Sequence, residues 1–296
     1  MKSILIIGNG KWANKILSFL KKKKTFHKIY VKTRKEIFIL QNKVKKKIKI
    51  LPQYNNIDLV HVCSPLSTHY LYLKKFQNHK SLIIEKPFLK NLNDFFKIKK
   101  KNYNAKGKVI VNYIDLYNPI IHIFKKKIKC KVTKIIFEYS DPKSFFKKKY
   151  MCVEDWLEHP LSLILFFFKK FTKYKILKKI FIRNKKKFLE KVEIEFAYRN
   201  IIVVIRINFQ NKKTRKIYLF KGKKLNFLAN LKKNIIIKKN IGIVDNSNIN
   251  NITRLYSSAL SRKRTFYQSF SFYEKVLTQR VDIINSLKKI TNYNKF

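Results

Sequence analysis

The sequence is poor in the residues that mark several classes of protein. Its three cysteines, Cys63, Cys130 and Cys152, are odd in number and widely spaced, so they do not form a disulfide framework. Five glycines and six prolines exclude collagen-like and flexible-linker chains. Acidic residues are also scarce, with 16 Asp and Glu against 70 Lys and Arg, a formal net charge of +54. The cysteine pattern predicts a reduced, cytoplasmic protein.

Long apolar runs are missing as well. The longest, Leu161–Phe168, is about half of the roughly 20 residues that a bilayer span needs. Met1–Ile7 is too short for the apolar part of a signal peptide. We therefore expect no membrane span and no export signal. The chain has 296 residues, 46% of them hydrophobic and including 25 Phe, so it can fill one large or two modest cores, and disorder is excluded.

The positive charge has two interpretations. A strongly basic chain is an electrostatic indication of nucleic-acid binding. Here, however, the basic residues are 61 Lys and 9 Arg, and they are spread from end to end. Proteins that recognise nucleic acids usually gather their basic residues on one face and favour Arg, whose guanidinium can form two hydrogen bonds to one group. Lys, Asn, Ile, Phe and Tyr are enriched together, as adenine- and thymine-rich codons would produce. We therefore expect no specific nucleic-acid partner, and only weak, salt-sensitive binding to DNA or RNA.

The order of apolar runs and amphipathic segments predicts a two-domain α/β protein. Residues 1–115 alternate strands and helices, which predicts a doubly wound parallel Rossmann sheet. Residues 116–296 predict an α+β domain with a large, mostly antiparallel open sheet and a closing helix at about 267–289. The expected strands are 3–7, 28–32, 48–51, 59–63, 81–84, 109–113, 134–139, 192–198, 201–209, 215–220 and 224–228. The expected helices are 11–21, 68–76, 93–101, 119–127 and 153–168.

A glycine motif follows the first expected strand and opens the first helix. It reads Gly8-Asn9-Gly10-Lys11-Trp12-Ala13. Glycine is needed at the tight turn and where the backbone approaches a pyrophosphate, and a small residue where helix packs on strand. The free N–H groups and the positive end of the helix dipole then favour an anion. Because two of the five glycines in the chain have this spacing at this place, the motif predicts a dinucleotide site.

The end of the second strand predicts the type of dinucleotide. An acidic residue there binds the ribose 2′-hydroxyl of NAD, whereas a basic residue accepts the 2′-phosphate of NADP. The sequence has Thr33 and Arg34 at this point and its first acid only at Glu36. This favours NADP(H), with NAD(H) as the alternative, since basic residues are common everywhere in this chain.

Two further motifs lie at the ends of expected parallel strands, where open α/β sheets bind ligands. They are Cys63-Ser64-Pro65-Leu66-Ser67-Thr68-His69 and Glu85-Lys86-Pro87. With the glycine motif, they make the chain resemble the glucose–fructose oxidoreductase and inositol dehydrogenase (Gfo/Idh/MocA) family of NAD(P)-dependent sugar oxidoreductases. The resemblance implies a set of cofactor-binding residues: Gly8, Asn9, Gly10, Lys11, Trp12, Ala13, Thr33, Arg34, Ser64, Pro65, His69, Glu85 and Lys86. His69 has an alternative interpretation as a cap of the following helix.

The resemblance also implies catalytic residues. Family members carry an Asp-x-x-x-His pattern on a long helix of the second domain, and Asp155 and His159 supply it here. Four residues apart, the two side chains share a helix face, so Asp155 is expected to orient His159. Lys86 is the third catalytic candidate, and either Lys86 or His159 would take the substrate's proton. Met151-Cys152-Val153 departs from the family's pattern before the Asp. No sequence cluster has metal-ligand spacing, and the other histidines, among them His61, have no recognisable partner.

The sequence therefore predicts an NAD(P)-dependent oxidoreductase that transfers hydride to or from a carbon–oxygen bond of a sugar, cyclitol or nucleotide sugar. Surface-polysaccharide metabolism is the expected context, and a homo-oligomer through the C-terminal sheet is implied by the family. Two alternatives come from other classes: a catalytically silent sensor that binds the dinucleotide, and a basic nucleic-acid-binding protein. Lys86, Asp155 and His159 together argue against the sensor, and the diffuse lysines argue against the nucleic-acid binder.

Overall fold

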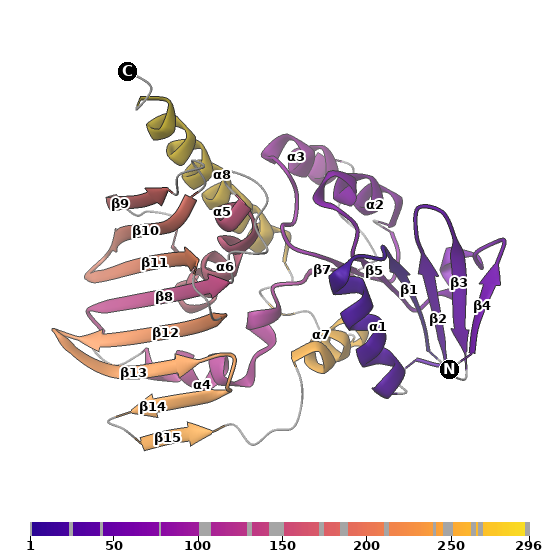
Figure 1. The fold of residues 1–296 in the computed structure, drawn as a ribbon, viewed down its shortest axis with the longest axis horizontal. Coiled ribbons are helices and arrows are strands. Elements are labelled where there is room, and N and C mark those ends of the chain that lie inside the picture. The colour runs from indigo at the N-terminus through magenta and orange to yellow at the C-terminus, as the bar shows by residue number, and fades with distance from the viewer. Residues whose placement is uncertain are drawn as a thin grey trace. The chain divides into compact units, whose positions relative to one another are not determined.

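The structure is a computed structural model of residues 1–296 (Figure 1). It describes residues 2–23, 26–41, 44–76, 78–100, 108–128, 132–141, 151–171, 175–183, 189–209, 213–238, 241–244, 251–261, 265 and 269–293. The chain divides into two compact units. Unit 1 comprises residues 1–112 and 255–277, and unit 2 comprises residues 113–254 and 278–296.

Unit 1 is built on a seven-stranded sheet with the strand order β4-β3-β2-β1-β5-β6-β7. Strands β2, β1, β5, β6 and β7 are parallel. Every residue of β1, β5, β6 and β7 is buried, as expected for parallel strands that are covered on both faces. The elements before the second unit are β1 (Ser3–Ile7), α1 (Lys11–Lys23), β2 (Lys28–Lys32), β3 (Ile37–Gln41), β4 (Val44–Ile48), η1 (Tyr54–Asn56), β5 (Leu59–Val62), η2 (Leu66–Thr68), α2 (His69–Phe76), β6 (Ser81–Ile84), α3 (Leu92–Lys100) and β7 (Lys108–Val111).

The end of this sheet differs from the expected one. Instead of a short strand at 48–51, an antiparallel hairpin of β3 and β4 extends the sheet beyond β2. The edge strand β4 has the sequence Val-Lys-Lys-Lys-Ile, and its first four residues are exposed. A row of lysines on an edge strand opposes pairing with another chain, so part of the lysine excess protects this edge.

Unit 2 is built on an eight-stranded sheet with the order β15-β14-β13-β12-β8-β11-β10-β9. Every neighbouring pair in it is antiparallel except β8 and β11. Its elements are η3 (Ile114–Tyr117), α4 (Pro119–Lys127), β8 (Lys134–Asp141), α5 (Met151–Trp156), α6 (Glu158–Phe167), β9 (Lys175–Arg183), β10 (Leu189–Tyr198), β11 (Ile201–Phe209), β12 (Thr214–Lys221), β13 (Lys224–Asn230), β14 (Ile235–Lys238) and β15 (Ile241–Val244). The expected fold class, a Rossmann sheet followed by a mostly antiparallel sheet, is confirmed.

The two faces of the second sheet differ in burial. On one face, residues in register across the strands are all fully buried, as in the row Ile194, Ile205, Phe137, Ile217 and Ala229. The residues between them point to the opposite face, and many of these are only half-buried. The sheet therefore has one face in the core of unit 2 and one open face.

The last two helices connect the units along the chain. They are α7 (Asn251–Leu260) and α8 (Phe270–Tyr293). Lys108, at the start of β7, donates from Nζ to the carbonyl oxygens of Ser258 and Ser261, and the Ser81 hydroxyl donates to that of Ala259. These bonds tie the second half of α7 to the Rossmann sheet, which is why unit 1 includes residues 255–277. The boundary expected at residue 115, as a division into domains, stays a prediction.

Candidate functional site

The three sequence motifs of unit 1 meet at one edge of the Rossmann sheet. Gly8 follows β1, Cys63 follows β5 and Glu85 follows β6, and these strands are parallel neighbours. Gly8 has a φ of +121°, and a Cβ built on it would lie 2.7 Å from the carbonyl oxygen of Cys63. Only glycine fits both this backbone conformation and this close approach. The strand order thus brings together motifs that are distant in the sequence.

The start of α1 has the properties of an anion-binding site. A Cβ built on Gly10 would meet no atom within 4 Å, so the backbone faces open space here. The first turn of α1 contains no acidic residue, so its free N–H groups and positive dipole end keep their attraction for an anion. The segment from Gly8 to Ala13 therefore fits the pyrophosphate of a dinucleotide.

Glu85 connects the glycine motif to the Glu-Lys-Pro motif. Its Oε1 accepts hydrogen bonds from Nε1 of Trp12, from Nδ2 of Asn112 at 2.7 Å and from Nε2 of His61 at 2.9 Å. Three donors on one oxygen suit a carboxylate, which can only accept. Trp12 lies in the first turn of α1, which begins directly after Gly10. The network therefore holds the glycine motif against Glu85, the residue before Lys86.

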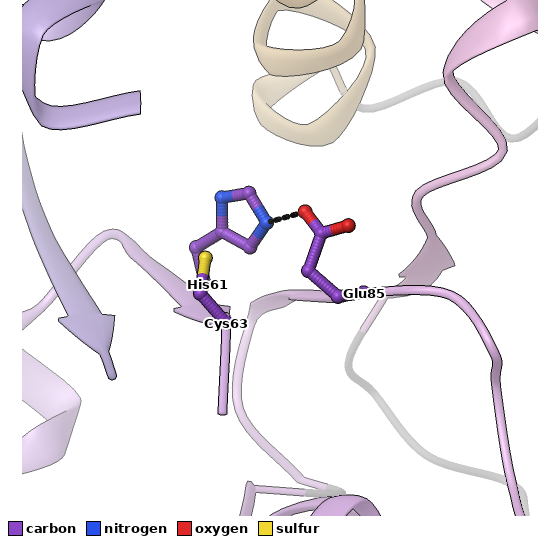
Figure 2. Close-up of side chains that lie close together, drawn as sticks. All are labelled: His61, Cys63 and Glu85. Carbon is purple, nitrogen blue, oxygen red and sulfur yellow. Dashed lines mark hydrogen bonds and ion pairs between the residues drawn. The ribbon is translucent and has the colours of Figure 1, made fainter. Parts of the chain in front are cut away.

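Figure 2 shows the His61 imidazole bonded to the Glu85 carboxylate, with the Cys63 thiol close to both. Nδ1 of His61 lies 2.7 Å from the hydroxyl of Tyr256, which can donate to it when Nε2 carries the ring proton. Burial and the Glu85 charge raise the pKa of the Cys63 thiol. Burial, with Cys63 and Glu85 nearby, also raises the pKa of Tyr256. Both groups are therefore neutral at pH 7.

His61, Cys63 and Glu85 also raise the question of a metal site. Within the part of the chain that the structure describes, they form the one group of three metal-type side chains, with ligand atoms all within 4.8 Å. However, His61 and Glu85 already hydrogen-bond each other, and a thiolate, the form that binds metal, is disfavoured at Cys63. The geometry favours a hydrogen-bonded network over a metal centre, and the absence of a metal stays a prediction.

A buried acceptor beside Glu85 fits a ligand. Oδ1 of Asn112 is buried and has no hydrogen-bond partner among the described residues, although its amide nitrogen is bonded to Glu85. A buried acceptor without a partner is costly, and a donor from a bound ligand would remove that cost. Asn112 was not among the residues selected from the sequence. It lies directly after β7, at the same edge of the sheet as Glu85.

His69 and Ser64 lie in the loop and helix after β5. Nε2 of His69 is 2.9 Å from the carbonyl oxygen of Ser64, and Nδ1 is 2.9 Å from that of Pro87. The Ser64 and Thr68 hydroxyls are 2.6 Å apart. His69 therefore ties the loop after β5 to the Pro87 carbonyl, one residue after Lys86. Lys86 is half-buried at this point, and a cofactor contact for any of these residues stays a prediction.

The end of β2 carries the residues expected to select the cofactor. The Thr33 hydroxyl accepts from the Glu36 N–H at 2.9 Å and so builds the turn into β3, while Arg34 is exposed at the tip of that turn. Beside the turn lies a cavity of about 640 Å³, lined by Lys32, Ile37 and residues 49–55. Lys49 is a second basic residue in its wall. The cavity has a volume typical of small-molecule sites.

In unit 2 the expected Asp155–His159 helix is divided into two. Helix α5 ends at Trp156 and α6 begins at Glu158, because Pro160 has no N–H and its ring crowds the carbonyl of Trp156 one turn earlier. Leu157, between the two helices, keeps helical backbone angles, so Asp155 and His159 are still about one helical turn apart. Asp115 also places a carboxylate beside His159: its Oδ2 lies 3.2 Å from Nδ1 of His159.

Asp115 and its other partners were missed by the sequence analysis. Nη1 of Arg215 lies 2.6 Å from Oδ1 of Asp115, and the hydroxyl of Tyr139 donates to Oδ2 at 3.1 Å. The one local signal was an acid within the mostly apolar run Val109–Pro119 of a chain with 16 acidic residues. Arg215, 100 residues further along, has no such signal.

A parallel sheet with a glycine turn, an acid-free helix start and a ligand-sized cavity at its carboxyl edge defines a dinucleotide-binding domain. Residues 2–113 match the model of the oxidoreductase family with an NAD-binding Rossmann fold, GFO_IDH_MocA. This match over residues 2–113 confirms the resemblance inferred from the three motifs. Among curated proteins, none matches the sequence.

Solved structures are similar over nearly the whole chain. The dehydrogenase MviM from Clostridium difficile is 15% identical with a TM-score of 0.77, and the alignment covers 96% of this chain and 99% of that one. UDP-N-acetylglucosamine 3-dehydrogenase GnnA from Acidithiobacillus ferrooxidans is 12% identical with a TM-score of 0.73, and 95% of each chain is covered. A point mutant of KijD10, a 3-ketoreductase from Actinomadura kijaniata in complex with TDP-benzene and NADP, is 8% identical with a TM-score of 0.68, covering 96% and 97%. At these identities the likeness establishes the fold. No helix in the described ranges is both long and apolar enough to cross a membrane.

Proposed function

We propose that this protein is an NADP(H)-preferring oxidoreductase that acts on a carbon–oxygen bond of a nucleotide sugar, with a free sugar or a cyclitol as the alternative substrate. The observation that carries the proposal is the Glu85 network, which joins Trp12 of the glycine motif to the residue before Lys86. The nucleotide-sugar class is supported by two similar proteins: one is a UDP-N-acetylglucosamine 3-dehydrogenase, and the other is a 3-ketoreductase in complex with TDP-benzene and NADP. We further propose the cytoplasm as its location, on the basis of the cysteine pattern.

The cofactor would lie along the edge of the Rossmann sheet. Gly8 to Ala13 would hold its pyrophosphate, and Arg34 with Lys32 and Lys49 would favour the 2′-phosphate of NADP. Bound nicotinamide supplies the position that gains or gives the hydride. Asn112 Oδ1 would accept a hydrogen bond from the ligand. Ser64, Pro65, His69 and Glu85 complete the proposed cofactor site.

The residues proposed for the chemistry handle the proton. When an alcohol is oxidised, its carbon loses a hydride, with two electrons, and its oxygen loses a proton to a basic side chain. Lys86 and His159 are the candidates for that base, and Asp155 is retained as the third catalytic candidate. For reduction of a ketone, the same side chain returns the proton.

The test is a screen of nucleotide sugars, sugars and polyols with NADP⁺ and NAD⁺, read by the absorbance of the reduced nicotinamide. Lys86→Ala and His159→Ala should each lower turnover by about 10²–10⁴-fold with nearly unchanged cofactor affinity. Lys90→Ala, at an exposed lysine four residues away, is the matched control. Near-normal turnover in both variants would overturn these assignments. Tight dinucleotide binding without turnover on any substrate would favour the silent sensor.

Cofactor selection is tested at two positions. Gly10→Val should abolish dinucleotide binding and leave the fold intact, because a side chain there enters open space in the protein but occupies the pyrophosphate's place. Arg34→Ala should weaken NADPH more than NADH, by about 1–3 kcal/mol for a lost charge-assisted contact. An equal loss for both cofactors would refute the 2′-phosphate assignment.

We also propose that the open face of the second sheet forms a homo-oligomer. Three of the scarce acidic residues, Glu138, Glu193 and Glu195, lie on this face. Arg206 stands between Glu193 and Glu138 in register and pairs with Glu193 at 2.8 Å. Alternating charges of this kind are self-complementary across a two-fold axis. Sedimentation analysis should give a dimer or larger for the native chain and a smaller species for Glu138→Lys.

A further inference from the structure

Asp115 is the centre of a buried polar cluster in unit 2. It lies in η3, is 1% exposed, and contacts side chains from three other elements. These are Tyr139 on β8, His159 on α6 and Arg215 on β12. Arg215 occupies Oδ1, whereas His159 and Tyr139 share Oδ2. Both oxygens of the carboxylate are therefore engaged.

The charge state of Asp115 follows from these partners. Burial alone raises the pKa of the carboxyl, but the charges of Arg215 and His159 and their hydrogen bonds outweigh it and hold the pKa well below its usual range. Asp115 is therefore an anion at neutral pH, with no proton to donate. Nδ1 of His159 lies at an ion-pair distance of 3.2 Å from Oδ2, and a proton in this contact must belong to the histidine, because an ionised carboxylate has none to give. In the neutral ring, the lone pair is then on Nε2.

Two aromatic rings hold the orientation of this imidazole. Tyr139 stacks on His159 with ring centroids 5.9 Å apart and an interplanar angle of 15°. Trp156 lies on the ring at 5.3 Å and is itself contacted by Arg215, whose guanidinium carbon is 4.9 Å from the indole centroid. The groups that fix the carboxylate also fix the imidazole, so neither ring rotation nor tautomer exchange occurs without breaking a buried contact.

We propose that Asp115, and not Asp155, is the positioning residue that fixes His159 as the Nδ1-protonated tautomer and so makes Nε2 its proton-accepting atom. The inference rests on the proposed function only in giving His159 a proton to accept. In that reaction the substrate O–H bond breaks and its proton joins Nε2, while the carbon's hydride reduces the nicotinamide and the C–O bond becomes C=O. The imidazolium that forms keeps its Nδ1–H directed at Asp115, whose negative charge stabilises it.

The tautomer can be measured without substrate or cofactor. The chain has six histidines, so uniform ¹⁵N-histidine labelling and long-range ¹H–¹⁵N spectra give a small set of ring patterns, and the one missing from His159→Gln belongs to His159. At a pH where the ring is neutral, we expect a protonated Nδ1 and an unprotonated Nε2. A protonated Nε2 would overturn the proposal. Because the spectrum does not depend on turnover, its failure is distinct from a failure of the proposed enzyme activity.

Variants then separate Asp115 from its rival. Asp115→Asn should convert His159 to a mixture of tautomers or to the Nε2-protonated form, whereas Asp155→Asn and Tyr139→Phe should keep the native pattern. The reverse result, with the pattern lost in Asp155→Asn and kept in Asp115→Asn, would assign the role to Asp155 as the sequence predicted. Once a substrate is known, Asp115→Asn should lower kcat by about 10²–10⁴-fold with little change in KM. If Asp115→Asn does not fold, Asp155→Asn decides between the two carboxylates: a native tautomer pattern in that variant supports Asp115, and a lost pattern overturns the proposal.

Discussion

Each unit buries one carboxylate against a histidine, but the two carboxylates are compensated in different ways. Glu85 in unit 1 accepts hydrogen bonds from the indole of Trp12, the amide of Asn112 and the imidazole of His61, all on Oε1. Asp115 in unit 2 has the guanidinium of Arg215 on one oxygen. One site uses neutral or weakly basic donors, and the other uses a permanent positive charge.

The pKa values of the neighbouring side chains reflect this difference. Burial raises the pKa of Cys63 and of Tyr256, and the charge of Glu85 raises both further. Burial and Asp115 also raise the pKa of Tyr139, but there Arg215 acts in the opposite direction. The charge of Glu85 thus acts on its neighbours unopposed, whereas Arg215 offsets part of the effect of Asp115 on Tyr139. An arginine makes a carboxylate a fixed structural anion, and neutral donors leave its field available to a ligand.

The largest effect expected from this comparison is that of Asp115→Ala. Removing the anion leaves Arg215 and His159 without their counter-charge in a buried site, which should cost about 3–5 kcal/mol of the free energy of unfolding. Denaturation by urea measures this loss. Asp282→Ala, at an exposed position of α8, is the matched control and should change stability by less than about 0.5 kcal/mol. A loss below about 1 kcal/mol for Asp115→Ala would mean that Arg215 is well solvated without its partner.

Substitution by the amide of the same shape compares the Asp115 and Glu85 sites directly. Asp115→Asn must turn an NH₂ group toward either Arg215 or the shared oxygen position of His159 and Tyr139, so it should cost about 1.5–3 kcal/mol. Glu85→Gln can keep its carbonyl oxygen where all three donors already converge, so it should cost less than about 1 kcal/mol. The two variants are compared by urea denaturation under the same conditions. Equal losses would show that the distribution of donors over the two oxygens is unimportant.

Much of the fold could be predicted from the sequence because its buried strands can be recognised as short apolar segments. Strands β1, β5 and β6 are short, mostly apolar segments in which every residue is buried, and the three motifs follow them directly. The hairpin β3–β4 was missed because three of the five residues in β4 are lysines, placed there by the needs of an edge strand. The helix expected at 153–168 was interrupted by Pro160, a signal that the sequence did contain.

The sequence predicted those parts of the candidate site whose residues lie together in one short segment. The glycine, Ser-Pro and Glu-Lys-Pro motifs each follow one strand, so their common edge follows from the parallel order. Tyr256 meets His61 across 195 residues, and no local pattern marks such a pair. The contact between His159 and Asp115 was missed for the same reason: helical spacing points to Asp155, whereas Asp115 comes from η3, and the role of Asp155 stays a prediction. Long-range polar pairs depend on the packing of elements, which spacing in one segment does not contain.

For the Asp115 site, the effect of acid on stability has a definite sign. Its pKa is lowered in the folded state, so it contributes stability above its unfolded pKa of about 3.9 and loses that contribution as the pH falls through the folded value. Below about pH 4, the native protein should therefore lose up to about 1.4 kcal/mol per pH unit from this group. Urea midpoints recorded from pH 7 to pH 3 measure the slope. Asp115→Asn should show a shallower slope, and an unchanged slope would contradict the assignment.

The two tyrosines that contact the two clusters allow a comparison in which each variant loses a single hydroxyl. Tyr139→Phe removes one of two donors to Oδ2 of Asp115, and the carboxylate keeps Arg215 and His159, so the loss should be about 0.5–1.5 kcal/mol. Tyr256→Phe, its matched counterpart, leaves Nδ1 of the fully buried His61 without the donor that faces it and should cost more, about 1–3 kcal/mol. Both changes delete one hydroxyl and keep the ring, so the difference in urea midpoint reports the polar contact alone. If Tyr139→Phe proved the more damaging variant, the hydrogen bond to the charged acceptor would outweigh the unsatisfied histidine, and Arg215 would neutralise Asp115 less completely than the geometry indicates.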